Sequence, residues 1–170
     1  EWMAFQRQHF TAYLKHYLNA LHSHKPGIEI TDSWMYTART PEPIEAPVDF
    51  LSGDLATRES VNWARFDARY ISSTGMPWDL MAWGFIDGEN YSTSSINFYL
   101  KHNCQLMQEA AVILAQGGGF QIYYKPTRAG WLDDWMIQIM AEVAQFCRAR
   151  QDASHKSQTV PQVALLFSST

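Results

Sequence analysis

The side chains best suited to chemistry in this sequence follow short apolar runs. Asp32 and Trp34 lie at the end of the run IEITDSW, while Asp49 lies near the start of the run VDFLSGD and Asp54 ends it. A carboxylate at a strand end can act as a general acid or base, or can hold a sugar hydroxyl. The structural alternative for Asp54 and Asp32 is a turn or a helix cap, and Asp49 could equally pair with an arginine. The sequence therefore offers Asp54 and Asp32 as candidate catalytic residues.

Aromatic and basic side chains accompany these carboxylates. Trp83 ends the run WDLMAW, Tyr123 ends the run GFQIY, and Arg128 and Trp131 follow in the next loop. Aromatic faces can stack on sugar rings, although each ring could equally pack in the core and Arg128 could form a surface salt bridge. Gly84, after Trp83, is expected to let a ligand approach the backbone. The residues expected to bind substrate are Trp34, Asp49, Trp83, Tyr123, Arg128 and Trp131.

Alternating helical and strand-like stretches would position these side chains. Apolar residues three and four positions apart predict helices at 2–22, 59–72, about 100–116 and 131–150. Strands are expected at 28–36, 48–54, 78–85 and 119–128, with Ser52–Asp54 as a turn and a polar loop at 86–95. The continuous run LMAW is typical of a parallel strand that is buried on both faces.

This alternation predicts an α/β fold with parallel strands that are neighbours in chain order. In such sheets ligands bind beyond the carboxyl ends of the strands, so the candidate residues should share one rim. Four strands make half of an eight-stranded barrel. We therefore expect the second half of a (β/α)8 TIM barrel, with outer helices, and keep a free-standing open sheet as the rival.

Three segments are expected along the chain. Residues 1–151 would form the C-terminal half of the barrel, and the polar stretch 152–161 would be a linker ending at a proline. Residues 162–170 begin with QVALLF, which is expected to be the first strand of a following, truncated domain. Because residue 1 is glutamate, the natural start is expected to lie upstream.

Composition narrows the class of protein. The 170 residues carry a net charge of −4 without a basic stripe, which argues against nucleic acid as a partner. The sequence has no apolar run long enough to span a bilayer, so no membrane role is expected. The two cysteines suggest buried thiols, and the HxH pair His22/His24 is a weak metal signal. Neither a metal nor a cofactor is therefore expected, and 14% aromatic residues suit a carbohydrate partner.

Several motifs resemble a known family of enzymes. The segments PVDFLSGDL, PWDLMAWGF, GGGFQIYYKPTRAGW and SHKSQTVPQVALLFS are similar to bacterial glycoside hydrolases of the α-L-fucosidase type. Those enzymes have an α/β barrel followed by a domain like the β-galactosidase trimerisation domain. The resemblance covers residues from about Trp2 to Phe167. It implies a retaining exo-glycosidase from a bacterial cytoplasm or periplasm that acts on a terminal sugar.

The resemblance also carries expectations about the site. A retaining enzyme needs two carboxyl groups ~5–5.5 Å apart. The nucleophilic Asp of barrel fucosidases ends the fourth strand, which would precede residue 1, so only Asp54 and Asp32 match a strand-end position here. β-Galactosidases place a nucleophilic Glu at the seventh strand, but Trp83-Gly84-Phe85 stands there. A non-catalytic carbohydrate-binding barrel and a β-galactosidase-like enzyme remain alternatives. The rest of the barrel, a following domain and a second copy of the chain are the protein partners considered.

Overall fold

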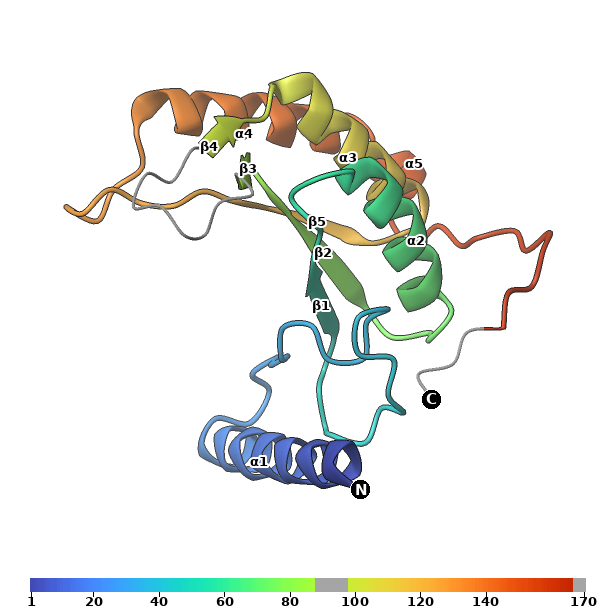
Figure 1. Ribbon diagram of the computed structural model, residues 1–170. Coiled ribbons are helices and arrows are strands. Elements are labelled where there is room, and N and C mark those ends of the chain that lie inside the picture. The colour runs from blue at the N-terminus through green and yellow to red at the C-terminus, as the bar shows by residue number, and fades with distance from the viewer. Residues whose placement is uncertain (88–97, 167–170) are drawn as a thin grey trace.

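Three parallel strands form the centre of the molecule, shown in a computed structural model that describes residues 1–87 and 98–166 (Figure 1). They are β1 (Leu51–Asp54), β2 (Trp78–Trp83) and β5 (Gly119–Tyr123), and their order in the sheet is β1-β2-β5. Leu51 lies opposite Trp78, and Asp79 lies opposite Gly119. The prediction of a parallel α/β sheet in chain order is confirmed for these strands. Ser52–Asp54 belongs to β1 and is not the turn expected from the sequence.

A helix follows or precedes each strand of the parallel sheet. The helices are α1 (Trp2–His24), α2 (Ser60–Ser72), α3 (Asn103–Ala115), α4 (Asp134–Arg148) and the short α5 (Gln151–Ser154). The four helices expected from apolar periodicity are therefore present, with ends shifted by a few residues.

The strand expected at 28–36 is reduced to two isolated bridges, of which one joins β1 and the other joins Met35 to Thr40. Ser33 pairs with Ser52 in parallel, and the Trp34 N–H donates to the Ser52 carbonyl at 2.8 Å. The φ angles of Trp34 and Tyr36 are 78° and 63°, which are left-handed conformations outside the range of an extended strand. The segment thus lies beside β1, as expected, but its backbone turns away before a ladder forms.

A short hairpin stands where the sequence suggested a plain loop. β3 (Phe85–Asp87) pairs antiparallel with β4 (Phe98–Leu100), and Phe85 lies opposite Leu100. The rest of the expected loop, 88–95, lies outside the described residues. The hairpin leaves from the carboxyl end of β2, beside Trp83.

The helices α2, α3 and α4 cover one face of the sheet and leave the other open (Figure 1). Alternate residues of β2, Leu80 and Ala82, are fully buried against apolar side chains of these helices. Asp79, Met81 and Trp83 point to the opposite face and are partly exposed. The expectation that this strand is buried on both faces was therefore wrong, because no helix packs on the second face in the described part of the chain.

Helix α1 packs on the segment that precedes β1 rather than on the sheet itself (Figure 1). Leu14 and Leu18 are its buried residues, and they join the hydrophobic core. Two ion pairs and one hydrogen bond tie α1 to the chain between residues 42 and 49: the ion pairs are Arg7–Glu42 at 2.7 Å and Lys15–Glu45 at 3.6 Å, and the hydrogen bond is His22–Asp49 at 2.9 Å. The other expected apolar residues of this helix, such as Tyr13 and Tyr17, are exposed.

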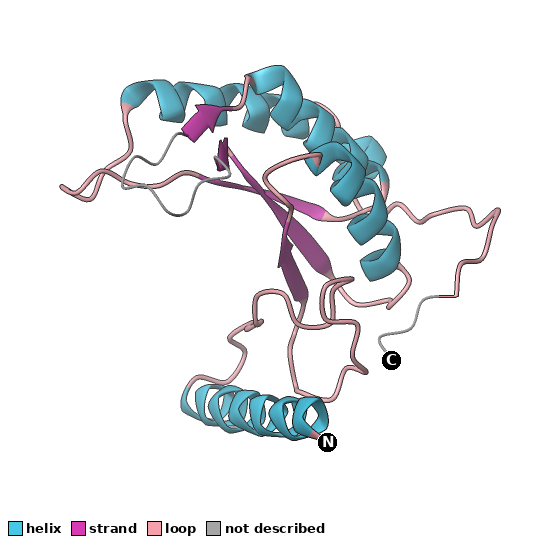
Figure 2. Cartoon of the chain, viewed as in Figure 1, coloured by secondary structure: helices cyan, strands magenta, loops and turns pink. Residues whose placement is uncertain are grey.

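The end of the chain has no regular structure after α5, as Figure 2 shows for residues up to 166. The side chains of Val163, Leu165 and Leu166 are largely exposed, with Leu166 at 96%. The segment QVALLF therefore forms no strand in its described residues, 162–166, and its place in a further domain stays a prediction.

Candidate functional site

Three predicted site residues come together at the carboxyl ends of the parallel strands. Asp54 ends β1, Trp83 ends β2 and Tyr123 ends β5, all on the open face of the sheet. The indole Nε1–H of Trp83 donates to Asp54 Oδ2 at 3.3 Å. The ring of Tyr123 meets the Trp83 ring edge-on, with 5.2 Å between centroids. These three residues, with Phe85, are called the rim cluster below.

Asp54 is the acidic group of the rim cluster. Only 8% of this residue is exposed, and its Oδ1 finds no hydrogen-bond partner among the described residues. It caps no helix, because the N-cap of α2 is Glu59. A buried carboxylate oxygen without a partner is costly, and a ligand hydroxyl could satisfy it. Asp54 can therefore hold a hydroxyl or exchange a proton with a bound molecule.

Aromatic rings form the apolar part of the rim cluster. Phe85, the first residue of the hairpin, lies 5.3 Å from Trp83 and 5.7 Å from Tyr123 between ring centroids. The Lys125 ammonium sits 5.0 Å from the centre of the Phe85 ring. Because Phe85 is 3% exposed, the partly buried rings of Trp83 and Tyr123 are the apolar faces that a ligand ring could contact beside the Asp54 carboxylate.

A polar row lies beneath the rim cluster on the same face of the sheet. Asp79 of β2 accepts from Ser52 Oγ of β1 at 2.6 Å and from Gln121 Nε2 of β5 at 2.6 Å. One carboxylate thus joins all three strands. We did not expect these residues from the sequence. The alternation in WDLMAW carried the signal, because it places Asp79 and Trp83 on one face.

Asp32 and Trp34 do not join the rim cluster. Ser33 pairs with Ser52, whose side chain is on the open face, so the alternating Asp32 side chain points toward α1. Its charge is one of the minor causes of a raised pKa at Tyr13 of α1, after the effect of Tyr17. Burial raises the pKa of Asp32 itself. The Trp34 side chain is 48% exposed at the turn that follows.

Asp49 has a structural role at the other end of this region. Its Oδ2 accepts from the backbone N–H of Ile30 at 2.8 Å and from His22 Nε2 at 2.9 Å. The Ile30 N–H first, and then His22, lower the pKa of this carboxyl group. Asp49 thus ties the end of α1 to the segment before β1, and it lies five residues before Asp54 along the chain. No contact joins it to the rim cluster in the described residues.

The other two residues predicted to bind substrate, Arg128 and Trp131, lie in the loop after β5. Arg128 and Trp131 are exposed in a turn closed by the Thr127 N–H and the Trp131 carbonyl at 2.8 Å. Neither contacts the rim cluster in the part of the chain described.

Tyr124 points to the opposite face from Tyr123, and its ring fills the space beside Gly84, where an added Cβ would lie 2.1 Å away. Gly84 therefore makes room for Tyr124, and not for a ligand as expected.

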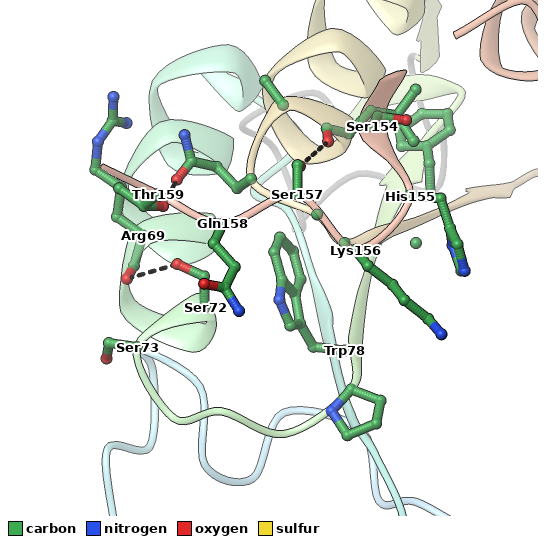
Figure 3. Close-up of a pocket in the computed structure, with 18 of the residues that line it drawn as sticks. Arg69, Ser72, Ser73, Trp78, Ser154, His155, Lys156, Ser157, Gln158 and Thr159 are labelled. Carbon is green, nitrogen blue, oxygen red and sulfur yellow. Dashed lines mark hydrogen bonds between the residues drawn. The ribbon is translucent and has the colours of Figure 1, made fainter. Parts of the chain in front are cut away.

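A cavity of about 1910 Å³ lies at the opposite, amino-terminal edge of the strands (Figure 3). It separates the final segment from Trp78 and the end of α2. Ser157 Oγ donates to the Leu114 carbonyl at 3.5 Å, and an added Cβ at Gly117 would lie 2.3 Å from the Ser157 carbonyl. Gly118 leaves space for the Trp78 ring in the same way. The glycine run 117–119 thus serves packing, and the cavity is remote from Asp54.

Comparisons with known proteins give no relative of this chain: no family model, no curated protein and no solved structure matches it. Among the described residues, no cluster of His, Cys, Asp and Glu could hold a metal ion. In the same residues, no helix has the length and apolar character that crossing a bilayer requires.

Proposed function

We propose that this chain is half of an α/β-barrel glycosidase of the α-L-fucosidase type, with Asp54 as its acid/base. The observation that carries the proposal is the rim cluster: a buried carboxylate with one free oxygen, packed beside aromatic rings where parallel strands end. Barrel enzymes build their sites at this edge. Glycoside hydrolysis needs a carboxyl group that can protonate the leaving oxygen.

The arrangement of helices supports a barrel over a doubly wound open sheet. A doubly wound sheet carries helices on both faces, whereas a barrel carries them all outside. Here α2, α3 and α4 share one face, and the other face holds polar and aromatic side chains. The rest of a barrel would enclose that open face.

Uncovered apolar surface at both edges supports the same proposal. In the described chain β5 pairs only with β2, and Val143 is the one buried residue of α4, while Ile137 is 49% exposed. At the other edge, Trp2 and Tyr17 of α1 are exposed. The remainder of a barrel would add a strand beside β5 and cover these helices. Such a remainder would also supply the nucleophile.

Asp54 is a better candidate than Asp32 for the acid/base. Asp54 faces the open side with the aromatic rings, whereas Asp32 points toward α1. Burial raises the pKa of Asp32, and its Oδ2 also has no hydrogen-bond partner among the described residues, so the choice rests on the face of the sheet to which each side chain points.

The test is turnover of an aryl α-L-fucoside by the complete enzyme. We expect Asp54→Asn to lower turnover by ~10²–10⁴-fold, and less with a good leaving group that needs little protonation. Asp49→Asn is the matched control: it should weaken the fold but leave turnover by the folded protein unchanged. Near-native turnover of poor leaving groups by Asp54→Asn would refute the assignment. If Asp32→Asn is then inactive, Asp32 becomes the acid/base.

A second candidate is a non-catalytic carbohydrate-binding barrel. One observation favours it: Asp54 is the one carboxylate hydrogen-bonded to the rim cluster in the described residues, whereas retaining hydrolysis needs two. Titration of the complete protein with L-fucose, followed by tryptophan fluorescence, separates the two functions. Binding that persists in Asp54→Asn without any turnover by the native protein would favour the binding module.

A further inference from the structure

We propose that Asp79 is a positioning residue, which holds Asp54 and Trp83 in register through the polar row that it forms with Ser52 and Gln121. Its two carboxylate oxygens are each engaged, Oδ1 by Ser52 Oγ at 2.6 Å and Oδ2 by Gln121 Nε2 at 2.6 Å. A carboxylate with both oxygens in use has less capacity to bind substrate than Asp54, whose Oδ1 is free. Its place between three strands suits a structural brace.

The polar row lies beneath the rim cluster on the open face of the sheet. Side chains two positions apart on a strand share one face. Ser52 stands two residues before Asp54, Asp79 four before Trp83, and Gln121 two before Tyr123. Met81 lies between Asp79 and Trp83 on that face, with Asp54 and Gln121 as its strand partners, so Asp79 is connected to the rim cluster through Ser52 on β1 and Gln121 on β5.

The hydrogen bond between Trp83 and Asp54 is the contact most sensitive to this brace. It spans β2 and β1 at 3.3 Å, near the long end of the range for an N–H···O bond. A small slide of β1 along β2 would break it. The Ser52–Asp79 bond joins the same two strands one layer lower and opposes that slide.

The test uses the complete protein, because the 170-residue chain alone is expected to self-associate, and it needs no ligand. The variants are Asp79→Leu, which removes the polar row, and Asp79→Asn, whose amide can still donate and accept. The readout is the Trp83 indole N–H signal in NMR, assigned by its loss in Trp83→Phe. The indole of Trp78, which faces the helices, is the internal control. We expect Asp79→Leu to shift the Trp83 signal and to speed its hydrogen exchange about fivefold, which matches the loss of one ordinary hydrogen bond. Asp79→Asn should restore the native signal.

The proposal is overturned if folded Asp79→Leu keeps the native Trp83 signal and exchange rate. If that variant does not fold, Ser52→Ala replaces it, with the same expected shift and the same contrary result. The positioning role of Asp79 does not depend on the proposed function, but the chemical role of the Asp54 that it positions does. If Asp79→Leu shifts the Trp83 signal while Asp54→Asn retains native turnover, the positioning role of Asp79 is supported and the assignment of Asp54 as the acid/base is rejected.

Discussion

The carboxyl group of Asp67 has a strongly raised pKa. This residue lies on α2 with 1% of its surface exposed, and burial raises its pKa from 3.8 to about 6. The Arg39 charge and the Ala38 N–H partly oppose this shift. Because protonation is easier in the folded state, this group favours folding most below pH 4 and loses that contribution as the pH rises through about 6.

We expect Asp67→Asn to remove this pH dependence. Asparagine keeps an acceptor for the Ala38 N–H but carries no charge to bury. The difference in free energy of unfolding between variant and native chain should grow in favour of the variant by about 2 kcal/mol from pH 4 to pH 8. Urea unfolding at several pH values measures it. The other carboxyl groups are common to both proteins and cancel in the difference, so parallel pH curves would contradict the prediction.

At the scale of single residues, the sequence predicted part of the rim cluster. Asp54, Trp83 and Tyr123 were expected together, since parallel strands place their carboxyl ends on one edge, and the structure places them together. Asp32 failed to join them because one residue of register reverses the face of a side chain. Asp49 has a partner 27 residues away, His22, which no local pattern could supply.

A buried ion pair joins two elements on the helical side of the sheet. Lys101 Nζ lies 2.9 Å from Glu109 Oε1 on α3, and both side chains are fully buried. Ser60, at the start of α2, donates to the same oxygen, while Glu109 Oε2 has no partner among the described residues. This network anchors the chain after the hairpin to α3 and α2.

Removing one charge of the pair should cost more than removing both. Lys101→Met would leave Glu109 buried and unpaired, and we expect a loss of about 3–5 kcal/mol in the free energy of unfolding. Adding Glu109→Leu removes the buried charge, so the double variant should recover most of that loss. Chemical denaturation of both single variants and the double variant measures this coupling. A double variant no more stable than Lys101→Met would show that packing, not charge, sets the cost.

The presence of the main helices and strands was easier to predict from the sequence than where each element ends or which strand it pairs with. Helices α2, α3 and α4 followed from apolar periodicity, because one face of each must be buried. The segment at 28–36 has the apolar pattern of a strand, but left-handed residues at Trp34 and Tyr36 end it early. The hairpin of β3 and β4 depends on pairing across the residues between them, so local sequence gave no sign of it.

At the scale of the whole chain, many large apolar side chains are exposed in the described residues. Helix α1 carries an exposed aromatic arc that includes Trp2, Phe5, Tyr13 and Tyr17, with Tyr13 and Tyr17 rings 4.6 Å apart. Large exposed apolar patches mark sites of protein contact or of aggregation. The barrel proposal accounts for this surface through the remaining half.

We expect the 170-residue chain alone to self-associate, because its apolar edges would be in water. Sedimentation velocity should show larger species as concentration rises from about 10 to 200 μM. Replacing Trp2, Phe5 and Tyr17 with glutamine should reduce this association, whereas Gln8→Ser and Asn19→Ser, at polar positions of the same helix, should not. If the native chain stays monomeric across that range, the exposed aromatic face of α1 is not a site of association.

The order β1-β2-β5 also has a consequence for how the chain folds. The strands of this sheet pair in the order in which they occur along the chain, although β3 and β4 lie between β2 and β5 in the sequence. Parallel pairing is slow when loops are long, because closing them costs entropy. Here the intervening α2 and α3 shorten each loop and supply the apolar face on which the strand settles. During synthesis on the ribosome, β1, α2 and β2 can therefore assemble as one unit while β5 is still being made, and the sheet then grows strand by strand in the direction of translation.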